Sequence, residues 1–499
     1  MRNNFPTNLI LPLFATTLVS LSACSLVVEK GTTQCTQESD CLDFGGHPTC
    51  QQGVCVPSGL GPPDCFFGEP STQAEFANQC TTARTFQFDN CVRLGLCDAA
   101  ALSSAMTVTA PPVNLGTTPP PAVTQPTPTV NCADVPNPIY ITGSSNAVPL
   151  IKAVQPVLSA ASPMYTAVML PQGSCKGISA VYDPDVTKHI IKNITNNAAF
   201  YYNSAGVQTL CLLDAAGVTV DVGASDVYPA SCGYSATAGI ADYIGPSQSI
   251  VMVVPSTSSQ TTISAEAAHL AFAAGGMNGK TAPWNDPRYY FVRNSGSGTT
   301  QMLSRAITVD ATKWWGVDRL SSPNLLASIE AVDPAFSENS IGILGSDFAD
   351  KSRANVRVLA FQQAGQTYGY LPDSTPDSLD KANVRDGHYP IWGALHFVAA
   401  TTNGVPPPAA SALITQFTVP RLEQTLVAAT IEAGFIPTCA MRVNHTTEVG
   451  PLVAYQPPFV CGCYFDSRIG RAGACQACTA SSECPSSAPS CNYGFCEKR

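Results

Sequence analysis

Short apolar runs and longer amphipathic stretches alternate along the middle of the chain, from about residue 136 to about residue 458. Apolar runs bounded by turn residues predict strands, and apolar residues at helical spacing predict helices. We expect strands at 139–141, 167–170, 218–222, 249–254 and 289–292, and helices at 148–161, at 265–274 and from 301 onward. The repeated order of strand, loop and helix predicts an α/β fold with mainly parallel sheets, whose ligands sit where the strands end.

Four loops that follow predicted strands are rich in Gly, Ser and Thr. They are 143–146 (GSSN), 173–177 (GSCKG), 223–226 (GASD) and 293–300 (RNSGSGTT). The last loop combines a guanidinium with several hydroxyls and two glycines, directly before an expected helix. Glycines let a backbone approach a ligand closely, a helix N-terminus offers unpaired N–H groups, and arginine adds a fixed charge. The pattern favours an oxyanion site over its alternative, a plain flexible turn.

The composition is typical of an exported, loop-rich protein. The chain has 499 residues, of which 45% are hydrophobic and 12% charged, with 37 Gly and 41 Pro. This length is enough for a large core and several structural units. The formal net charge is −10 and there is no basic run, which argues against a nucleic-acid partner. A negative protein can still bind an anion, because the local field of the site decides.

The N-terminus is typical of an export signal. Arg2 precedes an apolar segment at 9–21 that is too short and too polar to predict a membrane span. Residues 21–24 (LSAC) resemble a bacterial lipobox, which implies a lipoprotein signal peptide at 1–23 and lipidation of Cys24. We therefore expect a lipid-anchored protein of the bacterial cell envelope, periplasmic or outer-surface. The alternative is an ordinary signal peptide followed by an incidental cysteine.

The cysteines predict disulfide-bonded modules at both ends. Of 21 Cys, 20 remain after Cys24 is set apart, an even number that can pair completely in an oxidising compartment. Two sets of four have similar spacing and flanking residues: Cys35, Cys41, Cys50 and Cys55, and Cys478, Cys484, Cys491 and Cys496. We interpret them as one small module used twice, within 24–60 and 461–499. A zinc site is less favoured, because paired C-x2-C knuckles are missing.

The remaining cysteines divide between a second N-terminal segment and the main body. Residues 61–109 contain Cys65, Cys80, Cys91 and Cys97 and a predicted helix at 73–79. A Pro/Thr-rich linker at 110–131 precedes the body at 132–460. Eight cysteines in or beside the body are expected to form structural disulfides: Cys132, Cys175, Cys211, Cys232, Cys439, Cys461, Cys463 and Cys475. Cys475 and Cys478 also have C-x2-C spacing, for which a redox role competes with a structural one.

Six motifs along the body resemble those of a known family. They are ITGSSNAVPL, QGSCKGI, VDVGASD, WNDP, VRNSGSGTT and DGHYPIW, in this order. Together they resemble the periplasmic phosphate-binding proteins of ABC transporters, which are type 2 solute-binding proteins. The resemblance implies a two-lobed α/β fold with a ligand cleft between the lobes. The terminal cysteine modules, which would flank that fold, are not part of the family.

The resemblance also implies a set of ligand-binding residues: Ser144, Ser145, Asn146, Ser174, Ser225, Asp226, Arg293, Ser297, Gly298 and Thr299. Arg293 would supply the formal positive charge and the others hydroxyl or N–H donors. A carboxylate such as Asp226 repels an anion unless a proton lies between them. Phosphate at neutral pH carries a proton that it can donate and sulfate does not, so Asp226 would discriminate against sulfate.

The chain departs from the family at several positions. It has 146–148 (NAV) where the family usually has an aromatic or Thr-Phe pair, and Ser295 where an acidic residue is common. Lys176 in the second loop has two interpretations, a second positive charge of the site or a solvated surface lysine. Among the histidines only His388 lies near a matched motif, and a packing role is expected for it.

The function implied is extracytoplasmic binding of phosphate or a related oxyanion, serving uptake through an ABC permease or sensing. The alternative is an adhesion or structural lipoprotein that keeps the binding fold, which the modules and the Pro/Thr stalk favour. A secreted phosphatase would need a nucleophile, and no GxSxG, HExxH or Walker A pattern occurs in the sequence. We therefore expect no enzyme, and the sequence indicates neither a cofactor nor a metal.

Overall fold

The computed structural model describes residues 49–51, 54–56, 65–66, 68–87, 128, 130–193, 195–276, 281–419, 421–471 and 475–498. The expectations for the signal peptide, the lipobox, Cys35, Cys41, Cys91, Cys97 and most of the Pro/Thr-rich linker lie outside these residues. The chain separates into two units, Met1–Gly59 and Leu60–Arg499. Among the described residues, no helix is long and apolar enough to cross a membrane.

The described part of the first unit is a small hairpin. Strands β1 (Thr49–Gln51) and β2 (Val54–Val56) pair antiparallel, with Cys50 opposite Cys55. The other end of the chain carries the same element, because β20 (Ser490–Asn492) and β21 (Phe495–Glu497) pair with Cys491 opposite Cys496. The two hairpins have the same register, and the occurrence of one whole module at both ends stays a prediction.

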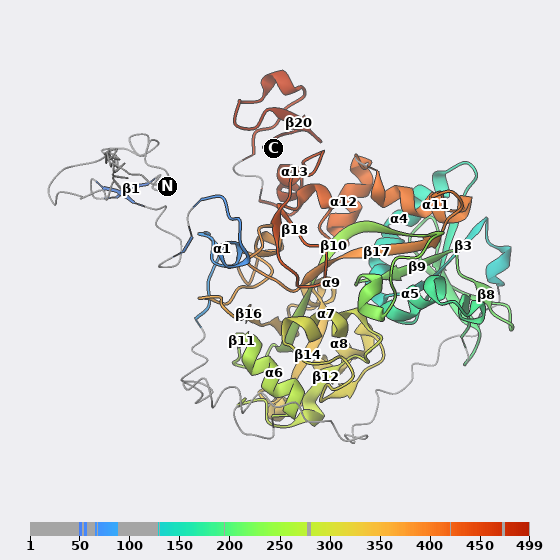
Figure 1. The fold of residues 1–499 in the computed structure, drawn as a ribbon, viewed down its shortest axis with the longest axis horizontal. Coiled ribbons are helices and arrows are strands. Elements are labelled where there is room, and N and C mark those ends of the chain that lie inside the picture. The colour runs from blue at the N-terminus through green and yellow to red at the C-terminus, as the bar shows by residue number, and fades with distance from the viewer. Residues whose placement is uncertain are drawn as a thin grey trace, which may run out of the picture. The chain divides into compact units, whose positions relative to one another are not determined.

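The second unit is organised by one large mixed sheet. Its strand order is β13-β12-β14-β10-β17-β9-β3-β4-β6-β7, and β15 pairs with β10 beside this path. The strands are β3 (Pro138–Gly143), β4 (Thr166–Pro171), β6 (Ala198–Tyr202), β7 (Gln208–Leu212), β9 (Val222–Ser225), β10 (Ile240–Pro255), β12 (Tyr290–Val292), β13 (Val317–Asp318), β14 (Ile341–Gly345), β15 (Val356–Val358) and β17 (Trp392–Ala400). Figure 1 shows the sheet running through both halves of this unit.

Strand β10 divides the sheet into two lobes. Its first half pairs antiparallel with β17, and its second half pairs antiparallel with β14 and β15. Lobe I contains β3, β4, β6, β7, β9, β17 and the first half of β10, and lobe II contains β12 to β15 and the second half of β10. The chain therefore passes from lobe I to lobe II along β10 and returns along β17, so these two strands form the hinge between the lobes.

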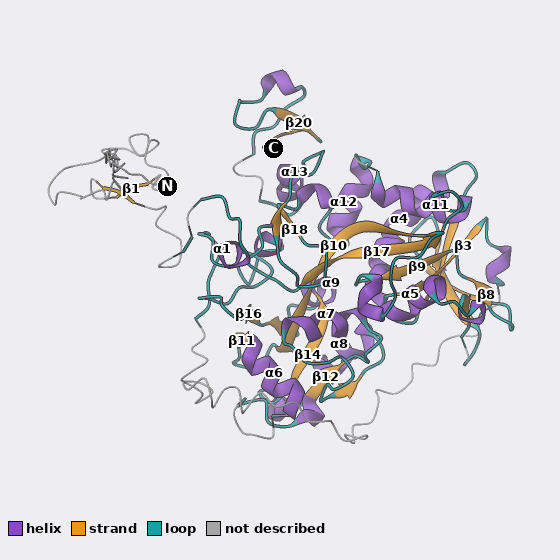
Figure 2. Ribbon diagram, viewed as in Figure 1, coloured by secondary structure: helices purple, strands orange, loops and turns teal. Residues whose placement is uncertain are grey.

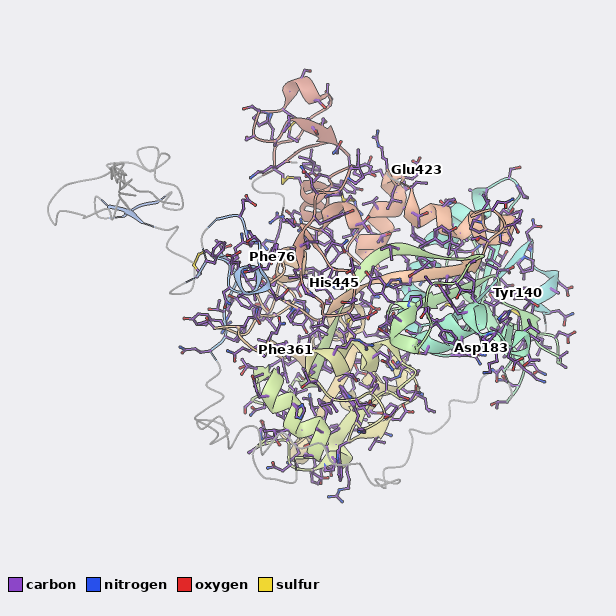
Figure 3. The ribbon with its side chains drawn as sticks, viewed as in Figure 1. Phe76, Tyr140, Asp183, Phe361, Glu423 and His445 are labelled. Atoms are coloured by element: carbon purple, nitrogen blue, oxygen red, sulfur yellow. A yellow bond between two sulfur atoms is a disulfide. The ribbon has the colours of Figure 1, made fainter. Side chains whose placement is uncertain are left out.

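Helices cover both lobes, as Figure 2 shows. The helices of lobe I are α4 (Val148–Ala160), α5 (Ser174–Tyr182), α11 (Pro408–Thr418) and α12 (Gln424–Glu432). Those of lobe II are α6 (Ala265–Ala274), α7 (Gly298–Ala306), α8 (Ser322–Glu330) and α9 (Ser346–Lys351). Tyr140 and Asp183, labelled in Figure 3, lie in lobe I, and Phe361 belongs to the core of lobe II. A two-lobed α/β fold flanked by disulfide-rich segments is therefore confirmed.

Two expectations about strands were wrong. The stretch 218–222 forms two strands, because β8 (Val218–Thr219) pairs with β5 (Ile190–Ile191) while β9 joins the main sheet. Asp221 separates them, since its carboxylate accepts a hydrogen bond from Tyr140 N–H at 2.8 Å and turns the chain. The sheet is mixed rather than mainly parallel, because both hinge strands run antiparallel to their neighbours. In contrast, α6 begins and ends at the expected residues.

The body cysteines form disulfides, as expected. The pairs are Cys132–Cys211, Cys175–Cys232, Cys439–Cys461 and Cys463–Cys475. The C-terminal module is closed on itself by Cys478–Cys491 and Cys484–Cys496, so Cys475 and Cys478 pair with different partners and form no redox couple with each other.

Segments at both ends of the second unit pack on lobe II. Cys65–Cys80 closes a loop around α1 (Gln73–Ala77). Phe76 of α1, labelled in Figure 3, is buried in the lobe II core. Towards the C-terminus, α13 (Gly462–Arg468) and the hairpin of β18 (Val443–Asn444) and β19 (Val453–Ala454) pack on the same core. From the middle of the chain, α10 (Ala382–Arg385) and the small parallel sheet of β11 (Thr262–Ser264) and β16 (Ala360–Gln362) also belong to lobe II.

Candidate functional site

Three loops of lobe I meet because their strands are parallel neighbours. Strand β3 pairs in parallel with β4 and with β9, so the loops after all three strands leave the same edge of the sheet. The backbones approach closely at Gly143, where a Cβ would lie 1.8 Å from Ala224 O, and the φ of Gly143 is +127°. Only glycine fits such a position without strain. The first, second and third loops thereby bring Ser144, Ser174 and Asp226 together.

Asp226 is the centre of the lobe I half of the site. Its carboxylate accepts hydrogen bonds from Ser144 Oγ at 2.7 Å to each oxygen, from Asn146 Nδ2 at 3.1 Å and from Ser174 Oγ at 3.2 Å. Three side chains from two other loops therefore orient one carboxylate.

Burial dominates the electrostatics of Asp226. Removal from water raises the pKa of its carboxyl above the usual value, and the hydrogen bonds from Ser144 and Ser174, the charge of Arg293 and the hydrogen bond from Asn146 oppose this shift. A carboxylate in this environment favours a partner that brings a proton to it.

Arg293 provides the charge from lobe II. It follows β12, is 5% exposed, and donates from Nη1 to Ser322 Oγ at 3.0 Å and to Ser145 Oγ at 3.5 Å. Its Nε is buried and has no hydrogen-bond partner among the described residues. Burial lowers the pKa of the guanidinium, and the charges of Asp318 and Asp226 raise it. Since arginine stays protonated even when shifted, a positive charge with an unused donor lies at the junction.

The N-terminus of α7 lies beside Asp226 and Arg293. Ser297 is the N-cap residue, and its side chain makes no capping hydrogen bond. The first N–H groups of the helix therefore receive no hydrogen bond acceptor from this side chain. Gly298 is required here, because a Cβ would lie 2.4 Å from Ser174 Oγ and 2.6 Å from Asp226 Oδ2. Thr300 Oγ1 donates to Arg293 O at 2.9 Å and so ties the arginine loop to the helix.

Hydrogen bonds join the two halves of the site across the lobes. Asn146 of lobe I donates to Thr299 Oγ1 at 3.4 Å and accepts from Ser322 Oγ at 3.2 Å. The N–H of Cys175 donates to Gly296 O at 3.0 Å. The lobes are thus in contact around the site, and a ligand that binds between Asp226 and Arg293 must enter by opening the hinge.

Two of the residues singled out in the sequence point elsewhere. Ser225 lies at the end of β9, where its hydroxyl donates to Val227 O at 2.7 Å and accepts from Val227 N–H. Lys176 directs its ammonium to Lys188 O at 3.2 Å, away from Asp226, and burial lowers its pKa. This geometry favours the surface interpretation of Lys176. His388 is buried between Asp386 and Gln79 O, in the packing role expected for it.

Ser322 is a site residue that the motifs do not include. It is the first residue of α8, 1% exposed, and contacts Arg293, Ser145 and Asn146. The only sequence signal was a helix start, because Ser321, Ser322 and Pro323 are typical of a capped first turn.

A cavity of about 220 Å³ lies beside the arginine loop. Arg293, Asn294 and Ser295 line it from β12 and the loop, and Thr312, Trp314 and Asp318 line it from the following segment. Arg293 therefore lines this cavity and also contacts Ser145 and Ser322.

Comparisons with known proteins give similarity of fold. No model of a protein family and no curated protein matches the chain. A protein provisionally assigned as a phosphate ABC transporter substrate-binding protein, from Clostridium perfringens and with bound phosphate, is 15% identical over 60% of this chain and 99% of its own, with a TM-score of 0.40. An ABC-type phosphate transport receptor from Vibrio cholerae is 13% identical over 60% and 100%, with a TM-score of 0.38.

Proteins of another kind also match the chain. The reduced OxyR regulatory domain from Pseudomonas aeruginosa is 11% identical over 56% of this chain and 96% of its own, with a TM-score of 0.30. At such identities and TM-scores the similarity carries no inference about the ligand. An inference about the ligand therefore has to rest on the side chains of this chain.

Proposed function

We propose that this protein is a lipid-anchored extracytoplasmic solute-binding protein for phosphate or a related oxyanion, serving uptake or sensing. The observation that carries the proposal is the convergence of Arg293, Asp226 and the N-terminus of α7 at the junction of two lobes. A helix N-terminus and a buried guanidinium both attract an anion. The hinge strands β10 and β17 would allow closure around it.

Asp226 narrows the ligand class. A buried carboxylate with a raised pKa would repel a fully deprotonated anion, and it would accept a hydrogen bond from an anion that still carries a proton. Phosphate and arsenate carry such a proton at neutral pH, whereas sulfate does not. The ligand-binding set that we propose is Ser144, Ser145, Asn146, Ser174, Asp226, Arg293, Ser297, Gly298 and Thr299, together with Ser322, and Ser225 supports it from β9.

Delivery of the ligand to an ABC permease and reporting of its concentration to a sensor require the same site. An adhesion or structural lipoprotein is the second candidate. It is favoured by the disulfide module at the C-terminus and by the donors of Ser144, Asn146 and Ser174, which already bond to Asp226.

Calorimetric titration of the mature protein with phosphate, arsenate, sulfate and a phosphonate tests the proposal. We expect phosphate to bind well and sulfate poorly. Arg293→Ala should weaken phosphate binding by roughly 2–5 kcal/mol, because it removes a buried, charge-assisted set of bonds. Asp226→Asn should narrow the gap between phosphate and sulfate, since an amide can donate as well as accept. If the wild type binds none of these anions at millimolar concentration, the adhesion candidate replaces this one.

A further inference from the structure

The β18–β19 hairpin carries a buried carboxylate to the junction of the lobes. Val443 and Leu452, at the two sides of the hairpin, belong to the lobe II core. Glu448 lies near its tip, and the side chain of Glu448 is only 3% exposed. The turn is held in an uncommon conformation, because Val449 has a φ of +56°. The hairpin therefore positions Glu448 from lobe II rather than leaving it in solvent.

Glu448 contacts both lobes. In lobe I, one carboxylate oxygen accepts from Tyr228 N–H and the other from Ser231 Oγ. In lobe II, Arg305 Nε lies 3.8 Å from the second oxygen. The hairpin makes a further contact with lobe I, because Tyr228 Oη donates to His445 O at 2.9 Å. His445, labelled in Figure 3, lies close to the hinge strand β17, with Nε2 3.1 Å from Trp392 O.

The residues that contact Glu448 belong to segments that also carry residues of the candidate site. Tyr228 is two residues after Asp226 and is the N-cap residue of the short 3-10 helix η5 (Pro229–Cys232). Cys232, at the end of η5, is bonded to Cys175, the neighbour of Ser174. On the other side, Arg305 lies in the last turn of α7, whose first turn contains Gly298 and Thr299. Glu448 thus joins the segment behind the lobe I half to the helix that forms the lobe II half.

We infer that Glu448 is a positioning residue that holds the two halves of the anion site in register when the lobes are closed. This inference rests on the proposed function of the site. Burial of a carboxylate costs desolvation free energy. Here an N–H and a hydroxyl of lobe I and a guanidinium of lobe II interact with the buried carboxylate and offset that cost. Opening the hinge would separate Arg305 and the hairpin from η5 and break these bonds. Glu448 therefore stabilises the closed arrangement, and its loss should favour the open one.

Glu448→Gln tests this inference, because it keeps the size of the side chain and removes its charge. Glu432→Gln is the matched control, since Glu432 pairs with Arg468 on the exposed face of α12. Two measurements apply to the full-length mature protein: hydrogen exchange of peptides that cover 227–233 and 298–306, and the rates of phosphate association and dissociation by stopped flow. A residue that only adds stability would not change the dissociation rate selectively.

We expect Glu448→Gln to accelerate exchange in both segments and phosphate dissociation by about ten-fold, with association changed less than about two-fold. Arg305→Gln should reproduce the effect, and the double variant should add little beyond either single variant. If Glu448→Gln does not fold, Arg305→Gln alone decides. Exchange and dissociation equal to those of Glu432→Gln would overturn the inference. If the wild type binds no phosphate, the proposed function fails, and the exchange measurement still decides the role of Glu448.

Discussion

Two buried aspartates near the junction of the lobes differ in the hydrogen bonds that their carboxylates accept. Asp226 accepts hydrogen bonds from three side chains. Asp347, at the start of α9, accepts one from Gln248 Nε2, at 2.6 Å to Oδ1. Neither Asp347 Oδ2 nor Gln248 Oε1 has a hydrogen-bond partner among the described residues, and Lys351 Nζ is 4.0 Å from Oδ2. A single proton on Oδ2 would satisfy both oxygens, as in a carboxylic acid–amide pair.

The environment of Asp347 favours that proton. The pKa of Asp347 is raised to about 7, chiefly by burial; the charges of Asp350 and Asp226 act in the same direction, and the charge of Lys351 and a hydrogen bond from Phe348 N–H oppose them. Gln248 lies in β10 where its pairing changes from β17 to β14, so the proton would be held in the hinge. Between about pH 4 and pH 7 the folded protein keeps this proton and the unfolded chain has lost it.

The free energy of unfolding should therefore fall as pH rises through this window. The loss should approach roughly 1.4 kcal/mol per pH unit, up to about 4 kcal/mol above pH 7. Asp347→Asn should flatten this dependence, because an amide can bond to Gln248 at both positions without titrating. Denaturant unfolding of both proteins at pH 5, 6, 7 and 8 measures the difference. Parallel curves for the two proteins would contradict the assignment.

At the scale of elements, the site depends on how α5 and η5 are fixed to each other. Ser174 begins α5 and Asp226 precedes η5, and the Cys175–Cys232 disulfide joins these two elements over a sequence separation of 57 residues. Cys175 N–H also bonds to Gly296 O of lobe II. Loops that would otherwise move independently are thereby held at the spacing that Asp226 needs.

Replacement of this disulfide should affect both stability and binding. In the chain-entropy model a closed loop of this length contributes about 4 kcal/mol. We expect the Cys175→Ser, Cys232→Ser double variant to lose stability on that order and to bind phosphate about ten-fold more weakly. The matched control is Cys132→Ser with Cys211→Ser, whose bond lies at the far strand β7 of lobe I. Calorimetry should show weaker binding only for the first pair, and an equal loss for both would contradict a role in the site.

At the scale of the whole molecule, one hinged body carries disulfide-bonded segments at its ends. The hairpin that places Cys491 opposite Cys496 has the register of the hairpin that places Cys50 opposite Cys55. Such small modules have too few apolar residues for a core and depend on their disulfides.

Anchoring is the whole-molecule property that the lipobox-like residues 21–24 predict. The mature protein should begin at Cys24 and carry a diacylglycerol group, and Cys24→Ala should release it from membranes or block its maturation. Intact-mass analysis of the wild type measures the adduct, and labelling of the denatured, unreduced protein should find almost no free thiols. A mature mass without a lipid, or stoichiometric thiol labelling, would argue against this prediction.

The sequence by itself determined the features that depend on near neighbours. The alanine-rich run 265–274 is sufficient to define α6, because helix propensity is local and the N-cap residue Ser264 is adjacent. The Gly- and Ser-rich loops were recognisable for the same reason, since a loop that follows a strand and begins a helix has a short-range signature. The 20 cysteines that remain after Cys24 is set apart can pair completely, which indicated disulfides but left their pairing open.

The tertiary structure decided what depends on residues far apart in the chain. Cys475 and Cys478 are three residues apart, yet one pairs with Cys463 and the other with Cys491, because packing sets which sulfurs meet. Ser322 reaches Arg293 because α8 packs beside β12 in lobe II. Glu448 reaches Tyr228 because the C-terminal hairpin folds back to the junction of the lobes. The burial of Asp347 and its hydrogen bond from Gln248 likewise depend on the packing of α9 against β10. Such contacts arise from the summed burial and pairing of whole elements, so no local pattern in the sequence encodes them.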